Sequence, residues 1–314
     1  MSEYDIFILG SGPAGLSSGI YTSRAKFKTL VIDLLSVPAQ IILTDLIENY
    51  PGFPEGINGF ELMSRFKLQA EKFGCEILST SIVPEILEFD SLKKIFKVSV
   101  DNNIYNTKTI VIATGRSWKP LGVENETKFV GKGISYCGVC DAAFFKDKVV
   151  CVIGGGDSAL QEALYISKFV KKLYLIHRRK EFRAVKVLQE RIFNCSNIEI
   201  VTPSIVKRIL GDEKVTGVEI EFVDTNVTKT LKCDGIFIFV GEKPNTEFLK
   251  KNDFSKQILS DENGYVITNA NMETNIEGIF ACGDCRNNNI KQIVTSCAEG
   301  VIAAESVRRF LEKL

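Results

Sequence analysis

Short runs of apolar residues that end at glycine form the clearest pattern in this chain. Residues 6–9 (Ile-Phe-Ile-Leu) are such a run and lead directly into Gly10. A segment with helical periodicity follows at residues 16–26, and residues 29–32 (Thr-Leu-Val-Ile) are a second apolar run. Because a continuous apolar run of this length is typical of a buried strand, the pattern predicts a strand–turn–helix–strand unit.

The same unit recurs in the middle of the chain. Residues 149–153 predict a strand, a glycine-rich turn and a helix to about residue 169 follow, and residues 173–176 predict the next strand. Residues 109–115 and 235–241 also correspond, because in each an apolar strand ends at a glycine and a proline follows soon after. Repetition of the unit indicates that the two halves share one plan.

Alternating apolar and polar residues at 85–105 and again at 215–231 predict an antiparallel insertion in each half. Residues 278–284, followed by a helix from about Gln292, predict a last strand and helix that return to the first half. We therefore predict an α/β fold with two Rossmann-like, three-layer ββα dinucleotide-binding domains, the second inserted in the first. The expected domains are residues 1–117 with 246–314, and residues 118–245.

Composition limits the classes of partner. The chain has 314 residues, 45% of them hydrophobic, and its 39 basic and 39 acidic residues give a net charge of zero. This balance gives no electrostatic reason to expect nucleic acid or an anionic membrane as a partner. The apolar runs are too short to span a bilayer and no basic leader is visible, so we expect a cytoplasmic protein in which most of the nine cysteines are inert thiols.

The first glycine-rich turn has the residues that a pyrophosphate site requires. Gly10 permits the tight bend, Gly12 lets the backbone approach the anion, and Gly15 lets the helix pack closely on the strand. Asp33 stands at the end of the next strand, where a carboxylate accepts hydrogen bonds from the ribose hydroxyls of an adenosine. An ordinary capping aspartate is the alternative interpretation of Asp33.

The second turn, with Gly154, Gly156 and Ala159, has the same plan, but its next strand ends in basic residues: His177, Arg178, Arg179 and then Arg183. Arginine side chains suit a phosphate dianion, so this turn favours the 2′-phosphate of NADPH over NADH. A solvated basic helix start is the alternative. Because His177 is the only histidine, we expect neither a histidine-based nucleophilic triad nor a metal site.

Two cysteines lie shortly before the second turn, in the sequence Cys137-Gly-Val-Cys140-Asp141. A CxxC pair lowers the thiol pKa and closes a small, easily reduced ring, which suits exchange with the disulfide of another protein. Asp141 is then a candidate to carry the proton of that exchange. Half of a zinc site is the alternative, with Cys282 and Cys285 as the other half.

With these motifs in order, the chain closely resembles the low-molecular-weight thioredoxin reductases over essentially its whole length. The resemblance rests on both glycine-rich turns, the CxxC-Asp sequence, the basic residues after the second turn, and residues 40, 48–52, 162–163, 283–284 and 292. It implies a homodimeric enzyme in which NADPH reduces FAD, FAD reduces the Cys137–Cys140 disulfide, and the dithiol reduces thioredoxin. It also implies that one domain rotates against the other, so that dithiol and nicotinamide reach the flavin in turn.

The resemblance further implies the residues that bind each cofactor. FAD is expected to contact Gly10, Ser11, Gly12, Pro13, Ala14, Gly15, Asp33, Gln40, Asn49, Gly283, Asp284, Lys291, Gln292 and Ile293. NADPH is expected to contact Gly154, Gly156, Asp157, Ser158, Ala159, Glu162, His177, Arg178, Arg179 and Arg183. By the same pattern Cys140 faces the flavin and Cys137 attacks the partner disulfide.

Several positions depart from the family pattern and leave alternatives open. Gly138-Val139 stands where Ala-Thr or Ala-Val is commoner, and Lys291 where arginine is usual. Cys282 and Cys285 are interpreted as small fillers beside the flavin, with a second redox dithiol as the alternative. Competing functions are the reduction of a peroxiredoxin-linked disulfide protein, a ferredoxin-driven reductase, an oxygen-using dithiol oxidase, and a non-catalytic nucleotide-binding redox sensor.

Overall fold

A computed structural model of the chain describes residues 2–35, 40–44, 46–47, 49–287 and 290–314. The chain divides into two compact units, Met1–Ser117 with Lys243–Leu314, and Trp118–Glu242. The second unit is thus inserted in the first, and the second crossing lies a few residues before the one expected at 245/246. In the described part of the chain, no helix has the length and apolar character needed to cross a membrane.

The first unit is built on a mixed sheet with strand order β3-β2-β1-β6-β5-β4, in which β17 also pairs with β6. Parallel pairs join β1 to β2 and β6, β2 to β3, and β6 to β17, whereas β4, β5 and β6 pair antiparallel. The strands are β1 (Ser2–Leu9), β2 (Thr29–Leu34), β3 (Glu76–Thr80), β4 (Glu85–Asp90), β5 (Ile95–Val100), β6 (Asn103–Ile112) and β17 (Ile279–Ala281).

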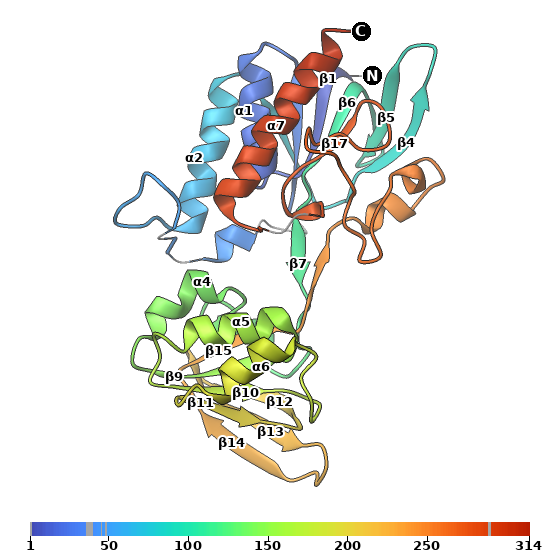
Figure 1. The fold of residues 1–314 in the computed structure, drawn as a ribbon. Helices are drawn as coiled ribbons and strands as arrows, with labels where there is room; N and C mark the ends of the chain where they lie inside the picture. The colour runs from blue at the N-terminus through green and yellow to red at the C-terminus, as the bar shows by residue number, and fades with distance from the viewer. Residues whose placement is uncertain (1, 36–39, 45, 48, 288–289) are drawn as a thin grey trace. The chain divides into compact units, whose positions relative to one another are not determined.

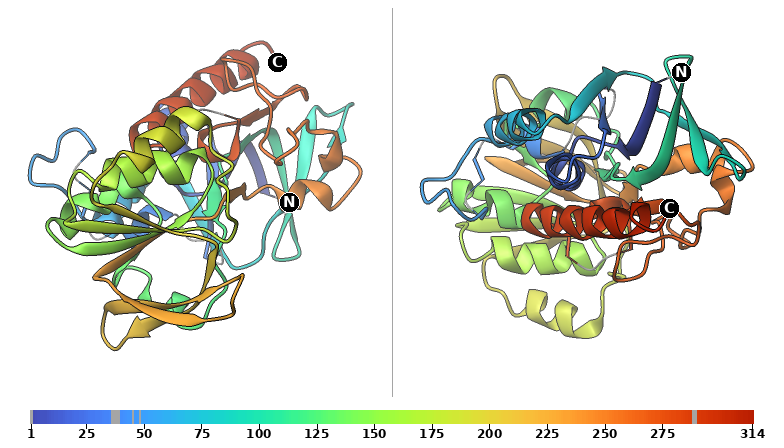
Figure 2. Two further views of the ribbon diagram at one scale, coloured as in Figure 1. Left: turned by 60° about the horizontal axis from the view of Figure 1, so that its bottom comes forward. Right: turned by 90° about the horizontal axis from the view of Figure 1, so that it is seen from above.

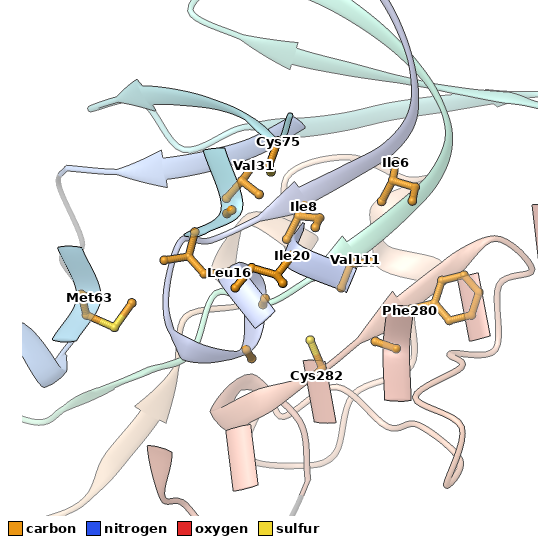
Figure 3. Packing of buried hydrophobic residues seen from close by; sticks show 14 of the residues in the cluster. Ile6, Ile8, Leu16, Ile20, Val31, Met63, Cys75, Val111, Phe280 and Cys282 are labelled. Atoms are coloured by element: carbon orange, nitrogen blue, oxygen red, sulfur yellow. The ribbon is translucent and has the colours of Figure 1, made fainter. Parts of the chain in front are cut away.

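Helices cover one face of this sheet. They are α1 (Pro13–Arg24), α2 (Gly59–Lys72) and α7 (Ile293–Leu311), and α1 contacts both of the others (Figures 1 and 2). Alternate strand residues such as Ile6, Ile8 and Val31 pack with Leu16 and Ile20 of α1 in the core beneath the helices (Figure 3). The opposite strand residues, such as Phe7 and Leu9, pack in a second core with β4 and β5.

The second unit repeats this arrangement. Its sheet is parallel, in the order β11-β10-β9-β15-β8, and a separate antiparallel sheet has the order β12-β13-β14. The strands are β8 (Ile134–Ser135), β9 (Val149–Gly154), β10 (Lys172–Ile176), β11 (Ile198–Val201), β12 (Ser204–Gly211), β13 (Val215–Phe222), β14 (Thr228–Lys232) and β15 (Gly235–Phe239).

One core of the second unit lies between the parallel sheet and its main helices, α5 (Asp157–Ile166) and α6 (Lys186–Phe193). Another core joins the parallel sheet to β12–β14 and gives the three-layer order that the sequence predicted. Shorter helices are α3 (Glu126–Phe129) and α4 (Gly138–Asp141). The two crossings between the units pair with each other as β7 (Arg116–Trp118) and β16 (Glu242–Pro244).

Several predicted elements are present with shifted ends: the helix expected at 16–26 is α1 (Pro13–Arg24), and the strand expected at 278–284 is β17 (Ile279–Ala281). A larger difference concerns β6. The sequence indicated an antiparallel insertion to residue 105 and a separate strand from residue 109, but β6 runs without a break from Asn103 to Ile112. Its first half pairs antiparallel with β5 and its last residues pair parallel with β17. One strand can do both because each partner occupies a different length of the same edge.

Candidate functional site

The first glycine-rich turn joins β1 to α1, and its three glycines meet different surroundings. A Cβ on Gly10, which has φ of +113°, would lie 2.3 Å from the Ala113 carbonyl oxygen, and one on Gly15 would lie 1.9 Å from that of Gly10. A Cβ on Gly12 would meet nothing within 4 Å. Gly10 and Gly15 are therefore required by packing, whereas Gly12, the N-cap of α1, borders open space beside the helix start. Pro13 and Ala14 begin α1.

Asp33 lies beside this turn, at the carboxyl end of β2. The Ser11 hydroxyl donates a hydrogen bond to its Oδ1, and Ser79 Oγ lies 3.4 Å from its Oδ2. Lys67 Nζ lies 3.7 Å from the same oxygen. The carboxylate is thus held toward the turn while a carboxylate's several lone pairs leave it able to accept further hydrogen bonds.

The C-terminal segment brings a second carboxylate to the same unit. A Cβ on Gly283, which has φ of +74°, would lie 2.8 Å from the Cβ of Ala14, so this segment packs directly on the start of α1. Asp284 accepts hydrogen bonds from Arg116 Nε at 3.0 Å and from Ser296 Oγ at 3.2 Å. Arg116 has no sequence motif that points to this role, so sequence reasoning missed it.

Two of the residues expected near the flavin ring, Asn49 and Gln292, contact each other. Asn49 Nδ2 donates to Gln292 Oε1 at 3.3 Å, although the two residues are far apart in sequence. Gln292 also forms a capping box with Thr295 at the start of α7, where Ile293 is the first helical residue. Lys291 Nζ donates to the Tyr265 hydroxyl at 2.8 Å and lies over that ring. The Gln40 side chain and Glu48 lie outside the described residues.

The cysteines of this unit are buried or half-buried thiols. Cys282 and Cys285 are fully buried, and Cys285 Sγ lies 3.3 Å from the Cys282 carbonyl oxygen. Burial raises the pKa of both thiols, that of Cys285 to about 11. Burial also raises the pKa of Cys297, whose Sγ lies 3.9 Å from the Tyr50 hydroxyl. Because the thiolate is the reactive form, Cys282 and Cys285 have the environment of packing residues.

The second glycine-rich turn joins β9 to α5 in the same manner. A Cβ on Gly156 would meet nothing within 4 Å, whereas one on Gly155 would lie 2.3 Å from His177 Nδ1. Ala159 packs where the first turn has its third glycine, close to Gly154. The Asp157 side chain accepts a hydrogen bond from the Val185 N–H at 2.8 Å, and Ser158 beside it is exposed.

A cavity of about 380 Å³ opens beside this turn. Its lining includes Gly154 and Gly155 of the turn, the ring of His177, and the basic side chains of Lys119, Arg178 and Arg183. Arg179 is exposed but is not part of the lining, and Lys119 is a lining residue that the sequence patterns did not indicate. One part of the cavity is thus the backbone of the glycine-rich turn, which suits a pyrophosphate. Another part is the group of basic side chains, which suits a further phosphate.

His177 has a packing role at this cavity. Its ring stacks on Phe182, with ring centroids 5.5 Å apart, and is 7% exposed. Burial lowers the pKa of His177, and the nearby guanidinium of Arg183 acts in the same direction. A lowered pKa favours the neutral form of the ring at neutral pH. In the part of the chain that the structure describes, no group of three or more His, Cys, Asp or Glu side chains is arranged to hold a metal ion.

Cys137 and Cys140 form a disulfide in the second unit, with their Cα atoms 5.3 Å apart. Cys137 is the N-cap of α4, and its Sγ accepts a hydrogen bond from the Cys140 N–H at 3.2 Å. Both cysteines are half-buried, whereas Val139 between them and Phe144 after them are exposed. The disulfide is therefore accessible at the surface of this unit.

Two carboxylates flank this short helix. Asp141, its last residue, accepts a hydrogen bond from Ser135 Oγ at 2.6 Å. Glu162 of α5 lies against the first residue of the helix, where a Cβ on Gly138 would fall 2.1 Å from its Oε2. The lack of a side chain at Gly138 thus lets Glu162 approach the CxxC turn. The sequence resemblance had assigned Glu162 to the nucleotide instead, and that assignment stays a prediction.

Comparison with known proteins defines the class. The family model described as "Pyridine nucleotide-disulphide oxidoreductase" matches residues 4–300. The chain therefore belongs to the pyridine nucleotide-disulphide oxidoreductase family, whose members use a flavin and a pyridine nucleotide. The enzyme class expected from the sequence, a disulfide oxidoreductase, is confirmed.

The similar proteins narrow the class further. The thioredoxin reductase of Rickettsia prowazekii (strain Madrid E) is 41% identical over 313 residues, which are 98% of each chain. That of Bacillus subtilis (strain 168) is 39% identical over 318 residues, 100% of this chain and 98% of the relative. The crystal structure of thioredoxin reductase from Streptococcus pyogenes MGAS5005 matches with a TM-score of 0.90 and 39% identity, over 100% of this chain and 99% of that one. The resemblance to low-molecular-weight thioredoxin reductases and the predicted fold class are confirmed.

Proposed function

We propose that the chain reduces thioredoxin with electrons from NADPH, through FAD and the Cys137–Cys140 disulfide. The observation that carries the proposal is the accessible disulfide at the start of α4, in the same unit as a glycine-rich turn with a basic cavity. Such a unit holds both a nucleotide site and a group that exchanges with protein disulfides. The full-length similarity to enzymes named thioredoxin reductases supports the choice of partner.

The first unit fits FAD. The open space beside Gly12 and the unpaired N–H groups at the start of α1 suit a pyrophosphate. The Asp33 carboxylate, held toward the turn by Ser11, suits the ribose of the adenosine. Asp284, held by Arg116 and Ser296, suits the chain that joins the pyrophosphate to the ring. When bound, FAD supplies a group that accepts two electrons from a nicotinamide and delivers them to a disulfide.

The second unit fits NADPH. The open space beside Gly156 repeats the arrangement at Gly12, and α5 presents its N-terminus there. Lys119, Arg178 and Arg183 give the cavity a positive charge that suits the 2′-phosphate, and NADH lacks this group. The ring of His177 packs on Gly155 and supports the backbone of the turn.

The dithiol exchange itself needs only this chain's own residues and the partner disulfide. In the reduced enzyme the Cys137 thiolate attacks the partner disulfide, forming a mixed disulfide and releasing one partner thiolate. The Cys140 thiol then loses its proton to Asp141, and its sulfur attacks Cys137, which restores the Cys137–Cys140 disulfide. The second partner sulfur leaves as a thiolate and receives the proton from Asp141, so two electrons pass to the partner.

We further infer a homodimer in the cytoplasm, as the sequence resemblance implies. Sedimentation at several protein concentrations tests this point. A monomer at micromolar concentration would contradict it.

The direct test compares Cys137→Ser and Cys140→Ser with the unmodified protein. Both variants should lose reduction of thioredoxin while NADPH still bleaches the flavin. If Cys140 faces the flavin, Cys137→Ser should show a long-wavelength charge-transfer band, because its remaining thiolate lies against the oxidised ring, and Cys140→Ser should not. Near-normal turnover by either variant would overturn the assignment.

A further inference from the structure

The Ser135 side chain lies directly between the first cysteine and Asp141. Ser135 is the last residue of β8 and is 5% exposed. Its Oγ accepts a hydrogen bond from the Cys137 N–H at 3.0 Å and donates to Asp141 Oδ2 at 2.6 Å. The same Oγ also lies 3.2 Å from the Cys137 carbonyl oxygen. One hydroxyl thus connects the start of the CxxC turn to the carboxylate at its end.

These three contacts satisfy the hydroxyl in both protonation states of Asp141. A serine hydroxyl has one donor and two acceptor lone pairs. When Asp141 is ionised, Oγ accepts from the Cys137 N–H and donates to Oδ2. When Asp141 is protonated, its O–H can donate to the second lone pair of Oγ, while the serine proton turns to the Cys137 carbonyl oxygen. Neither state requires a heavy atom to move.

We propose that Ser135 is a positioning residue of the dithiol exchange, which holds Asp141 in one place both as base and as acid. Asp141 takes the proton of the Cys140 thiol and later returns it to the leaving partner thiolate, so it passes through both states in each cycle. A carboxylate that reoriented between the two steps would lose this alignment, and alignment of reacting groups is a large part of catalysis. The inference rests on the acid–base role of Asp141 in the proposed function.

One other carboxylate, that of Glu162, lies near the CxxC turn. Glu162 of α5 packs against Gly138 of α4. It is a second carboxylate beside the CxxC turn, in addition to the Asp141 carboxylate that bonds Ser135. Measurements of pH dependence should therefore be repeated in Glu162→Gln, which keeps the shape of the side chain.

The test measures electron transfer from dithionite-reduced flavin to the internal disulfide, and reduction of a disulfide substrate, from pH 5 to 9. Ser135→Ala should slow the exchange about ten- to hundred-fold, the usual effect of losing a hydrogen bond to a charged group. Ser135→Ala should also move the part of the pH–rate profile that depends on Asp141 to higher pH. The reason is that the serine hydrogen bond stabilises the ionised carboxylate more than the protonated one, so its loss favours protonation. Ser135→Thr keeps the hydroxyl and should restore rate and profile.

Matched controls separate positioning from folding. Ser167→Ala removes another serine hydroxyl of the same unit, bonded to the Leu164 carbonyl oxygen at 2.9 Å, and should leave the exchange unchanged. Flavin content and thermal midpoint show whether each variant folds. If the two residues act as one unit, Ser135→Ala should add little to the loss already caused by Asp141→Asn.

Three results would overturn the inference. They are an unchanged rate and pH profile in Ser135→Ala, a loss that adds in full to that of Asp141→Asn, and a normal rate in Asp141→Asn itself. The last would also remove the acid–base role from the proposed function, whereas the first two would leave it intact. Failure of NADPH to bleach the flavin would count against the NADPH assignment alone, because the dithionite experiment still tests Ser135.

Discussion

Glycine is required for different reasons at two neighbouring positions of the second turn. At Gly155 the reason is packing, and at Gly156 it is access of the anion to the backbone. A methyl group at Gly156 enters open space, so Gly156→Ala should fold, whereas a methyl at Gly155 would lie 2.3 to 2.6 Å from atoms of the His177 ring. Gly156 is the N-cap of α5, and alanine there costs about 1 kcal/mol, or a few degrees in thermal midpoint. Overpacking at Gly155→Ala should cost about 1–3 kcal/mol or more.

The effect on NADPH binding should have the opposite order, with Gly156→Ala weakening it more than Gly155→Ala. If the anion of NADPH approaches the backbone at Gly156, an added methyl displaces it from at least one charge-assisted hydrogen bond, worth about 1.5–3 kcal/mol. We therefore expect about a ten- to hundred-fold weaker NADPH affinity in Gly156→Ala, with the flavin fully bound. The assay is flavin bleaching by stopped flow over a range of NADPH concentrations. Unchanged NADPH affinity in a folded Gly156→Ala protein would refute the placement of the pyrophosphate.

Three further predictions concern the cations, the histidine and the buried thiols. Replacing Arg178 and Arg183, which line the cavity, by glutamine should raise KM for NADPH about ten- to a hundred-fold per lost bond, and leave KM for NADH nearly unchanged. Burial lowers the pKa of His177 below its value in the unfolded chain. At a pH between these two pKa values, the unfolded chain binds a proton that the folded chain does not bind. The thermal midpoint should therefore fall as pH drops below about 6.5, and fall less in His177→Gln. Iodoacetamide at pH 8 should leave Cys282 and Cys285 of the folded protein unmodified, as mass spectrometry would show, because burial raises their pKa values.

The strands and turns could be predicted from the sequence because their signals are local. An apolar run that ends at a glycine, as at Gly10, fixes a strand end and a turn within a few residues. Likewise Asp33 and the basic residues after β10 could be chosen as ligands because their distance from each turn is set by the unit itself.

The contacts that complete the site could not be predicted because they depend on tertiary packing. Arg116 meets Asp284 only because β7 and the C-terminal segment come together in the first unit. Ser135 is an unremarkable serine in sequence, and its bonds to Cys137 and Asp141 require the tight turn between them. The approach of Glu162 to Gly138 depends on the packing of α4 on α5.

The insertion of one unit inside the other fixes the order in which they can be completed during synthesis. Every strand of the unit Trp118–Glu242 is present once Glu242 has left the ribosome. The unit that begins at the N-terminus must wait for β17 and α7, which cover β6 and α1. Because domains generally fold as units, the nascent chain should gain nucleotide binding before flavin binding, with α1 and its apolar face uncovered in the interval.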